Sequence, residues 1–343
     1  MTKNPRQHII LKDAEKCHAP ALPYLHLQKG ICEMPEKLPG SAAGKARPDD
    51  ILPETIIVAG GDLRFVSLAQ MLAQRRRVYA IGFDRSVIPD EKIILTDVMN
   101  IPERADMLIL PMPVSEDGVT LCCPFYTGAA DLSALAGRVK ENGRVFGGRV
   151  TDKVREIFSQ AGFDITDYFL REELSVLNAR ATAEGALQIA LEEQSTVISG
   201  QKILILGMGR IARSLIKVLS GFGADITVCA RKYSDLAWAE VEGCRSVHMS
   251  MLKGSPALSE AELIFNTVPH RILTEAELKC CRSDVLIIDL ASKPGGMDME
   301  AAGRLGLRAI WALSLPGKTA PVTSGRIIGE TIENILREQS CCG

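Results

Sequence analysis

Short apolar runs alternate with amphipathic segments from residue 55 onward. An amphipathic helix is expected after the first of these runs, with Phe65, Leu68, Ala69 and Leu72 on one face. Strands that are apolar throughout and alternate with helices are typical of a parallel sheet covered on both faces. We therefore expect an N-terminal α/β domain over residues 53–181, with strands at 55–59, 78–83, 107–110 and 145–147.

The same alternation returns after a bridging helix that we expect within 182–199. Apolar runs predict a second parallel α/β domain over 200–320, with strands at 202–206, 226–229, 263–266, 285–289 and 307–311. The remaining residues, 321–343, predict a C-terminal helix and tail with one apolar stripe. The expected fold class is α/β, with two Rossmann-like domains and a last helix that crosses back to the first domain.

Residues 1–52 lack any sustained period and contain repeated prolines, which break long elements. We expect a weakly ordered extension there, and we assign no catalytic role to His8, His18 or His26.

Composition narrows the classes of function. The 343 residues suit two domains, and 46% apolar with 24% charged residues is the balance of a globular protein. A net charge of −2 gives no electrostatic reason to expect nucleic acid or membrane as a partner. The first residues lack a signal-peptide core, so we expect a cytoplasmic protein. The ten cysteines show no metal-ligand spacing, which predicts reduced thiols and no metal site.

A glycine-rich motif follows the first strand of the second domain. Residues 207–212 read Gly-Met-Gly-Arg-Ile-Ala, between a strand and a helix expected at 211–219. Gly207 permits the tight turn, Gly209 lets the backbone approach a pyrophosphate, and Ala212 lets helix and strand pack closely. Free amides at the helix start favour phosphate. The motif predicts a nicotinamide dinucleotide site that includes Arg210 and Ile211.

The end of the next strand bears on the choice of cofactor. NAD enzymes commonly place an acid there for the ribose hydroxyls, but this chain has Arg231 and Lys232 after Ala230. Arg231 can pair with a 2′-phosphate, which predicts NADP. The alternative is a solvated pair of surface cations.

Three polar segments, 266–270, 289–296 and 315–321, are expected at the carboxyl edge of the second sheet, where ligands bind in open α/β sheets. His270 is a candidate proton acceptor, or it only packs its loop. Lys293 and Lys318 could bind a carboxylate or be ordinary surface lysines. Further candidates for cofactor contact on the first two segments are Thr267, Pro269 and Ala291.

Two helix starts carry further candidates. Thr182 and Glu184 open the expected bridging helix, as catalytic candidates or as an N-cap with an acid in the first turn. In the first domain, residues 60–62 read Gly-Gly-Asp and are followed by Arg64. This turn lacks the third small residue of a nucleotide loop, so we expect a substrate-facing turn with Asp62, or a purely structural one.

Together these motifs resemble the family of the dipicolinate synthase A subunit. The matching segments lie in the family's order from residue 55 to about 336: 60–64, 78–84, 182–185, 207–212, 230–231, 266–270, 289–296 and 315–317. At Lys293 the family usually has arginine, so this chain loses a bidentate fork there.

The resemblance implies NADP-dependent oxidation of dihydrodipicolinate to dipicolinate during spore formation, together with a second, flavoprotein-like subunit. It implies a dianionic substrate, for which Arg64, Lys293 and Lys318 are candidate counter-ions. We expect Arg64 and Lys293 to hold one carboxylate each. A homo-oligomer is also conceivable, and this chemistry requires no metal.

Two other functions compete with this one. A 2-hydroxy-acid dehydrogenase shares the two-domain plan but uses a late histidine, and no histidine follows His270. A non-catalytic NADP sensor or scaffold would need only the nucleotide loop. The dense polar loops at 266–270 and 289–296 favour catalysis.

Overall fold

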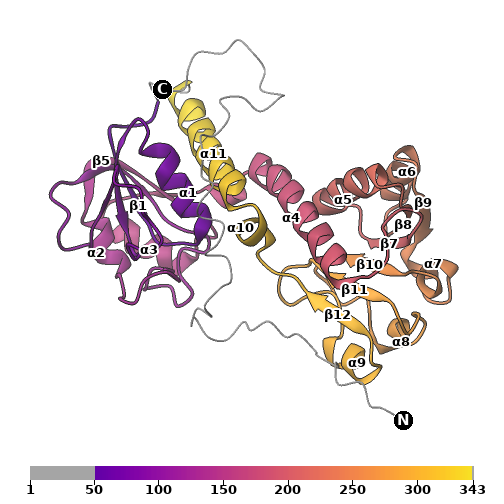
Figure 1. Cartoon of the computed structure of the whole chain (residues 1–343). Helices are drawn as coiled ribbons and strands as arrows, with labels where there is room; N and C mark the ends of the chain where they lie inside the picture. Colours follow the sequence, from indigo (N-terminus) through magenta and orange to yellow (C-terminus); the bar gives the residue numbers. More distant parts are fainter. Residues whose placement is uncertain (1–50, 342–343) are drawn as a thin grey trace. The chain divides into compact units, whose positions relative to one another are not determined.

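The structure is a computed structural model that describes residues 51–341. These residues form two compact units: an N-terminal unit of 51–171 with 328–341, and a central unit of 172–327 (Figure 1). Nearly all of the expected 1–52 extension, including the three N-terminal histidines, lies outside the described residues.

The N-terminal unit contains a six-stranded parallel sheet in the order β3-β2-β1-β4-β5-β6. Its core strand β1 is fully buried because both faces are covered. The strands are β1 (Thr55–Ala59), β2 (Arg77–Ile81), β3 (Ile93–Leu95), β4 (Ala105–Ile109), β5 (Val139–Gly147) and β6 (Ile165–Asp167). The helices are α1 (Leu63–Leu72), α2 (Leu132–Ala136), α3 (Asp152–Gln160) and the 3₁₀ turn η3 (Tyr168–Leu170).

The central unit repeats this plan with the order β12-β11-β10-β7-β8-β9, again all parallel. Its strands are β7 (Lys202–Leu206), β8 (Asp225–Ala230), β9 (Arg245–His248), β10 (Leu263–Asn266), β11 (Leu286–Asp289) and β12 (Arg308–Trp311). When the strands of each unit are numbered from one, and the central sheet is followed from β9 to β12, both orders are 3-2-1-4-5-6. This is the doubly wound order of dinucleotide-binding sheets. The expected fold class is therefore confirmed.

Two apolar clusters cover the central sheet. One joins it to α4 (Glu172–Glu193) and α5 (Arg210–Gly221), and the other lies under the shorter helices on the opposite face. The remaining helices are α6 (Tyr233–Val241), η4 (Met249–Met251), α7 (Pro256–Ser259), α8 (Glu275–Leu278), α9 (Met299–Arg304) and α10 (Leu315–Thr319).

The last helix, α11 (Pro321–Cys341), begins in the central unit and continues into the N-terminal unit from residue 328. Within the N-terminal unit it packs closely on α1, since a Cβ at Gly329 would lie 2.5 Å from Met71 Cε and 3.1 Å from Leu68 Cδ1 (Figure 1). The predicted return of this helix to the first domain is confirmed.

Some predicted boundaries were wrong. The bridging helix begins at Glu172 rather than Thr182, because Leu174 and Ala179 are already buried on its apolar face. Thr182 lies inside the helix, where its hydroxyl donates to the carbonyl of Asn178 at 2.9 Å, so it is not an N-cap. The polar segment 315–321 folds as α10 and the start of α11.

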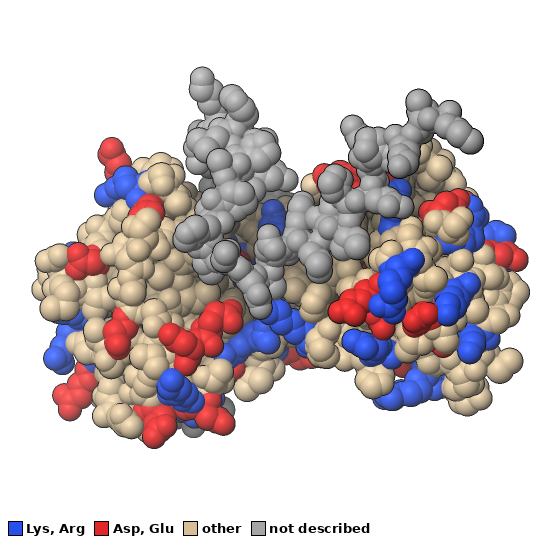
Figure 2. All heavy atoms as spheres, turned by 90° about the horizontal axis from the view of Figure 1, so that it is seen from below, with Lys and Arg blue, Asp and Glu red and all other residues tan. Residues whose placement is uncertain are grey.

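No helix among residues 51–341 is long and apolar enough to cross a membrane. On the face seen in Figure 2, basic and acidic side chains are interspersed, as expected for a net charge near zero.

Candidate functional site

The loop between β7 and α5 is shaped by a glycine that no other residue can replace without strain. Gly207 has a φ of +98°, and a Cβ there would lie 2.6 Å from Thr267 Oγ1. Thr267 in turn donates through its hydroxyl to the carbonyl of Leu206 at 2.8 Å. The ends of β7 and β10 are thus tied together beside the loop, at the point where the strand order reverses.

Gly209 is the N-cap of α5 and supplies no side-chain cap to the first amides of the helix. No atom lies within 4 Å of where its Cβ would be, whereas Ala212 is fully buried against the sheet. An anion can therefore approach the amides of this twelve-residue helix without meeting a side chain at residue 209. This geometry fits the pyrophosphate of a dinucleotide.

Arg210 and Ile211 form the first turn of α5. The Arg210 guanidinium donates from Nε to Glu172 Oε1 at 2.8 Å, in an ion pair whose side chains are both more than half exposed. Such an exposed pair contributes little to stability. Ile211 is partly buried against the central core.

The tip of β8 carries Arg231 and Lys232, both exposed, and Lys232 is the N-cap of α6. The Arg231 carbonyl is hydrogen-bonded to Nε2 of His248 at 2.9 Å. Tyr233 stacks on the His248 ring, with the centroids 5.0 Å apart and the planes at 20°. His248 lies on β9, a short strand that the pattern of apolar residues did not predict.

A buried polar network joins the loops that follow β10 and β11. Asn266 and Asp289 are 0% and 1% exposed, and Asn266 Nδ2 donates to Asp289 Oδ1 at 2.8 Å. The backbone amides of Ala291 and Gly296 also donate to the Asp289 carboxylate, at 3.0 and 2.8 Å. Asn266 Oδ1 accepts from the Val268 amide at 3.2 Å. Both loops are therefore fixed by one carboxylate and one amide side chain.

Close packing of Gly296 completes this network. A Cβ at Gly296 would lie 2.0 Å from Asn266 Nδ2 and 2.4 Å from the Val268 carbonyl, so only glycine fits. Trp311 Nε1 donates to the carbonyl of the buried Ala291 at 2.8 Å. The 289–296 loop is thus held from β10 and from β12.

The candidate ionisable groups stand on the exposed parts of these loops. His270 and the neighbouring Pro269 are exposed after β10, and Lys293 is exposed between the fixed ends of the 289–296 loop. Lys318 is exposed in the last turn of α10. Glu184 is also exposed, on α4. Their roles stay predictions, and His270 and Lys293 share the carboxyl edge of the sheet with the nucleotide loop.

In the N-terminal unit, Asp62 and Arg64 pair with each other. Asp62 caps α1, and the buried Arg64 donates from Nε and Nη2 to its carboxylate at 2.8 Å, and from Nη2 to the Met112 carbonyl at 3.3 Å. The fully buried Tyr168 lies close by, and burial raises the pKa of its phenol well above the usual value. Its hydroxyl donates to the Leu110 carbonyl at 2.9 Å.

The backbone conformation of the 60–64 turn requires the two glycines before Asp62. Gly60 and Gly61 have φ of +65° and +97°, and a Cβ at Gly60 would lie 2.6 Å from the Cys122 carbonyl. These contacts give the 60–64 turn a structural role. The contact between Arg64 and substrate stays a prediction.

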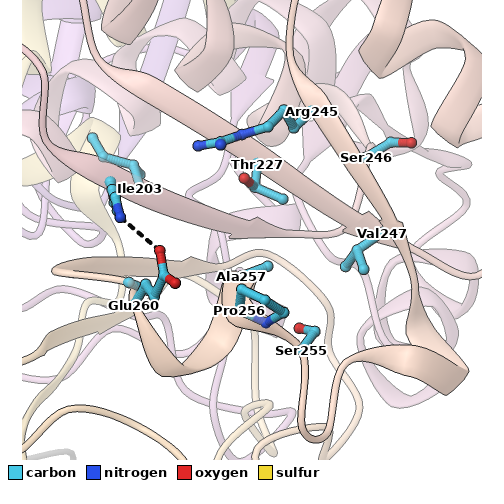
Figure 3. Close-up of a pocket in the computed structure, with 11 residues that line it drawn as sticks. Ile203, Thr227, Arg245, Ser246, Val247, Ser255, Pro256, Ala257 and Glu260 are labelled. Atoms are coloured by element: carbon cyan, nitrogen blue, oxygen red, sulfur yellow. Dashed lines mark hydrogen bonds and ion pairs between the residues drawn. The ribbon is translucent and has the colours of Figure 1, made fainter.

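A cavity of about 210 Å³ lies elsewhere in the central unit, among Thr227, Val247 and Pro256 (Figure 3). Lys202 and Arg245, which begin β7 and β9, also line it. The cavity therefore lies toward the amino ends of the strands, away from the nucleotide loop. No group of three possible metal ligands occurs among residues 51–341.

Comparisons with known proteins find similarities for both units. Residues 55–169 match the family model for the N-terminal domain of the dipicolinate synthase A subunit. Residues 175–294 match that of the NAD binding domain of D-isomer specific 2-hydroxyacid dehydrogenases. The dipicolinate synthase A subunit of Bacillus subtilis (strain 168) is 28% identical over 286 residues, covering 82% of this chain and 96% of that protein.

Solved structures agree with this. The dipicolinate synthase A chain from Bacillus subtilis superimposes with a TM-score of 0.74 at 27% identity, over 85% of this chain and 98% of that one. The structure of the same subunit from Bacillus halodurans also gives 0.74, at 24% identity, over 82% and 97%. The resemblance found in the sequence is confirmed, and the central unit is a nicotinamide-cofactor domain of the dehydrogenase type.

Proposed function

We propose that this chain, whose sequence and fold are those of the dipicolinate synthase A-subunit family, oxidises dihydrodipicolinate to dipicolinate with NADP during spore formation. The observation that carries the proposal is the juxtaposition at one sheet edge of an open α5 N-terminus at Gly209 and two rigid loops bearing His270 and Lys293. The match of residues 55–169 to the N-terminal family model supports the choice of substrate.

The reaction removes one hydride and one proton from the dihydropyridine ring, and aromatisation of the ring drives it. NADP, when bound at the 207–212 loop, would supply the hydride acceptor. His270 is the candidate that takes the proton, since an imidazole can accept a proton near neutral pH. The Asn266–Asp289 network keeps its loop in place beside the nucleotide loop.

Lys293 and Lys318 are the proposed counter-ions for substrate carboxylates in the central unit. Lys293 extends from a loop whose backbone is bonded to Asp289 at Ala291 and Gly296, which fixes the position from which its side chain reaches out. Arg64 stays a candidate as well, although its guanidinium is already bound to Asp62. A charge-assisted contact of this kind contributes about 1.5–3 kcal/mol.

NADP is favoured over NAD by the tip of β8. Arg231 and Lys232 stand where an acid would bind the ribose hydroxyls of NAD, and the first acid of α6 is Asp235. A guanidinium there suits a 2′-phosphate.

A partner is proposed because the name of the Bacillus subtilis relative makes it one of the subunits of a synthase. We propose a second, flavoprotein-like subunit, which the family resemblance implies. The test is therefore run with and without this second subunit.

The experiment mixes the purified chain with NADP and dihydrodipicolinate and follows the absorbance of NADPH. The proposal expects NADPH to form only when both compounds are present. NADP binding without turnover, both in the absence and in the presence of the partner, would instead favour a nucleotide sensor. Oxidation of a 2-hydroxy acid with no turnover of dihydrodipicolinate would contradict the proposed substrate.

A further inference from the structure

The ends of β8 and β9 lie side by side, with Ala230 paired to His248 in the strand register. The backbone turns immediately after Ala230 and places Arg231 next to His248. The histidine ring is held on two edges: Nε2 by the Arg231 carbonyl at 2.9 Å, and Nδ1 by the Ser250 hydroxyl at 2.8 Å. The Ser250 backbone amide also donates to Nδ1, at 3.3 Å.

These partners fix the proton on the imidazole. A backbone carbonyl only accepts hydrogen bonds, so Nε2 carries the hydrogen and donates to Arg231. Nδ1 then accepts from the Ser250 amide and caps η4. The neutral Nε2–H tautomer therefore satisfies both edges, and His248 acts as a rigid brace between η4 and the Arg231 backbone.

Tyr233 covers one face of this brace. Its ring stacks on the imidazole although 77% of the residue is exposed. The Tyr233 ring is therefore positioned by His248 and not by packing in the hydrophobic core. Tyr233 is the first residue of α6, and Lys232 is its N-cap. The stack therefore fixes the backbone on the other side of Arg231 and Lys232.

We propose that His248, with Tyr233, is a positioning element for cofactor selectivity, which holds the Arg231–Lys232 backbone so that its cations face the 2′-phosphate of NADP. The proposal rests on the proposed use of NADP. The physical reason is entropic: a long cationic side chain binds a phosphate better when its backbone is already fixed. NAD lacks the 2′-phosphate, so loss of the brace should weaken NADP binding and spare NAD.

The ratio of the two dissociation constants separates this role from a merely structural one. General damage to the site weakens both nucleotides alike, because they share every other group. His248→Phe keeps a ring for Tyr233 but removes all three hydrogen bonds of the imidazole. His248→Gln keeps an N–H donor for the Arg231 carbonyl.

Ser246 offers a matched control on the same strand. It lies two residues before His248, so its side chain points to the same face of the sheet, and its hydroxyl donates to Glu240 Oε1 of α6 at 2.8 Å. Ser246→Ala therefore removes one hydrogen bond between β9 and α6 and leaves the contact between His248 and Arg231 in place.

The experiment titrates NADP and NAD into the full chain by calorimetry, with thermal unfolding to check each variant. His248→Phe should weaken NADP roughly tenfold, about 1.4 kcal/mol, with NAD changed less than about twofold. His248→Gln should recover most of the selectivity, and Ser246→Ala should retain all of it. If His248→Phe does not fold, Tyr233→Ala, at an exposed position, replaces it with the same expected direction.

One result would overturn this inference and leave the proposed cofactor standing: a wild-type chain that selects NADP and a His248→Phe variant with the same ratio of the two dissociation constants. An equal loss of affinity for both nucleotides in the variant is one form of that result. A wild-type chain that binds NAD as tightly as NADP would instead overturn the proposed cofactor, and the inference with it.

Discussion

Asn266 Nδ2 lies 2.8 Å from Asp289 Oδ1, and this fully buried pair joins the carboxyl ends of β10 and β11. Each of the two side chains also bonds the backbone of its own loop, Asn266 at Val268 and Asp289 at Ala291 and Gly296. The loops bearing His270 and Lys293 therefore form one rigid unit.

Asp289→Asn should destabilise the chain although it preserves shape. The new amide group cannot accept from all three donors that the carboxylate satisfies, and each buried donor left unpaired costs about 1–3 kcal/mol. Denaturant unfolding measures the loss. Asp284→Asn is the control, because Asp284 is an exposed carboxylate paired with Arg282. Equal effects of the two changes would refute the role of the network.

Gly207→Ala should cost more stability than Gly243→Ala. Both glycines have positive φ, so both changes carry a backbone penalty of about 1–2 kcal/mol. Only at residue 207 does the new Cβ also meet a side chain, Thr267 Oγ1 at 2.6 Å, while no atom lies within 4 Å at residue 243. Thermal unfolding of the two variants compares them, and a larger loss for Gly243→Ala would contradict this interpretation of the loop.

Arg231→Asp should weaken NADP far more than NAD. Removing one charged contact to the 2′-phosphate costs about 1.5–3 kcal/mol, or roughly 10- to 150-fold in affinity. The introduced carboxylate additionally repels the phosphate. Fluorescence titration of both nucleotides measures the two changes, and equal losses would remove Arg231 from the 2′-phosphate.

Lys293→Ala should lower catalytic efficiency roughly 10- to 150-fold, mainly through a higher KM, because one counter-ion of the substrate is lost. NADP affinity should stay nearly unchanged. Lys293→Arg is the matched variant and should retain activity, since a guanidinium binds a carboxylate with a bidentate fork. Arg64→Ala is assayed beside it. Wild-type efficiency in Lys293→Ala would place the substrate carboxylates elsewhere.

The sequence was informative where one strong local pattern decided the structure. Buried strands such as β1 and β7 are continuous apolar runs, and the loop at Gly207 and Gly209 has a spacing that few other structures require. Both sheets and the nucleotide loop could therefore be predicted.

The edge strand β9 escaped prediction because it carries few apolar residues. β9 has only four residues, Arg245–His248, and none of them is fully buried. Since β9 went unrecognised, so did the contact of His248 with Arg231. The pairing of Asn266 with Asp289 also depends on strand register, which residue patterns do not fix. Thr182 was misplaced because the helix extends ten residues before the apolar window that suggested it.

A nicotinamide nucleotide that binds across the loop before α5 must bring its pyrophosphate close to Gly209, so the affinity of Gly209→Val for NADP tests this placement. The structure leaves open space at this Cβ, so the fold should survive, while the branched side chain should block the approach of the pyrophosphate. Calorimetry should find NADP binding in the wild-type chain and none in the variant, with unchanged thermal unfolding of the free proteins. Equal NADP affinity in a folded Gly209→Val chain would contradict the assignment of this loop to the cofactor.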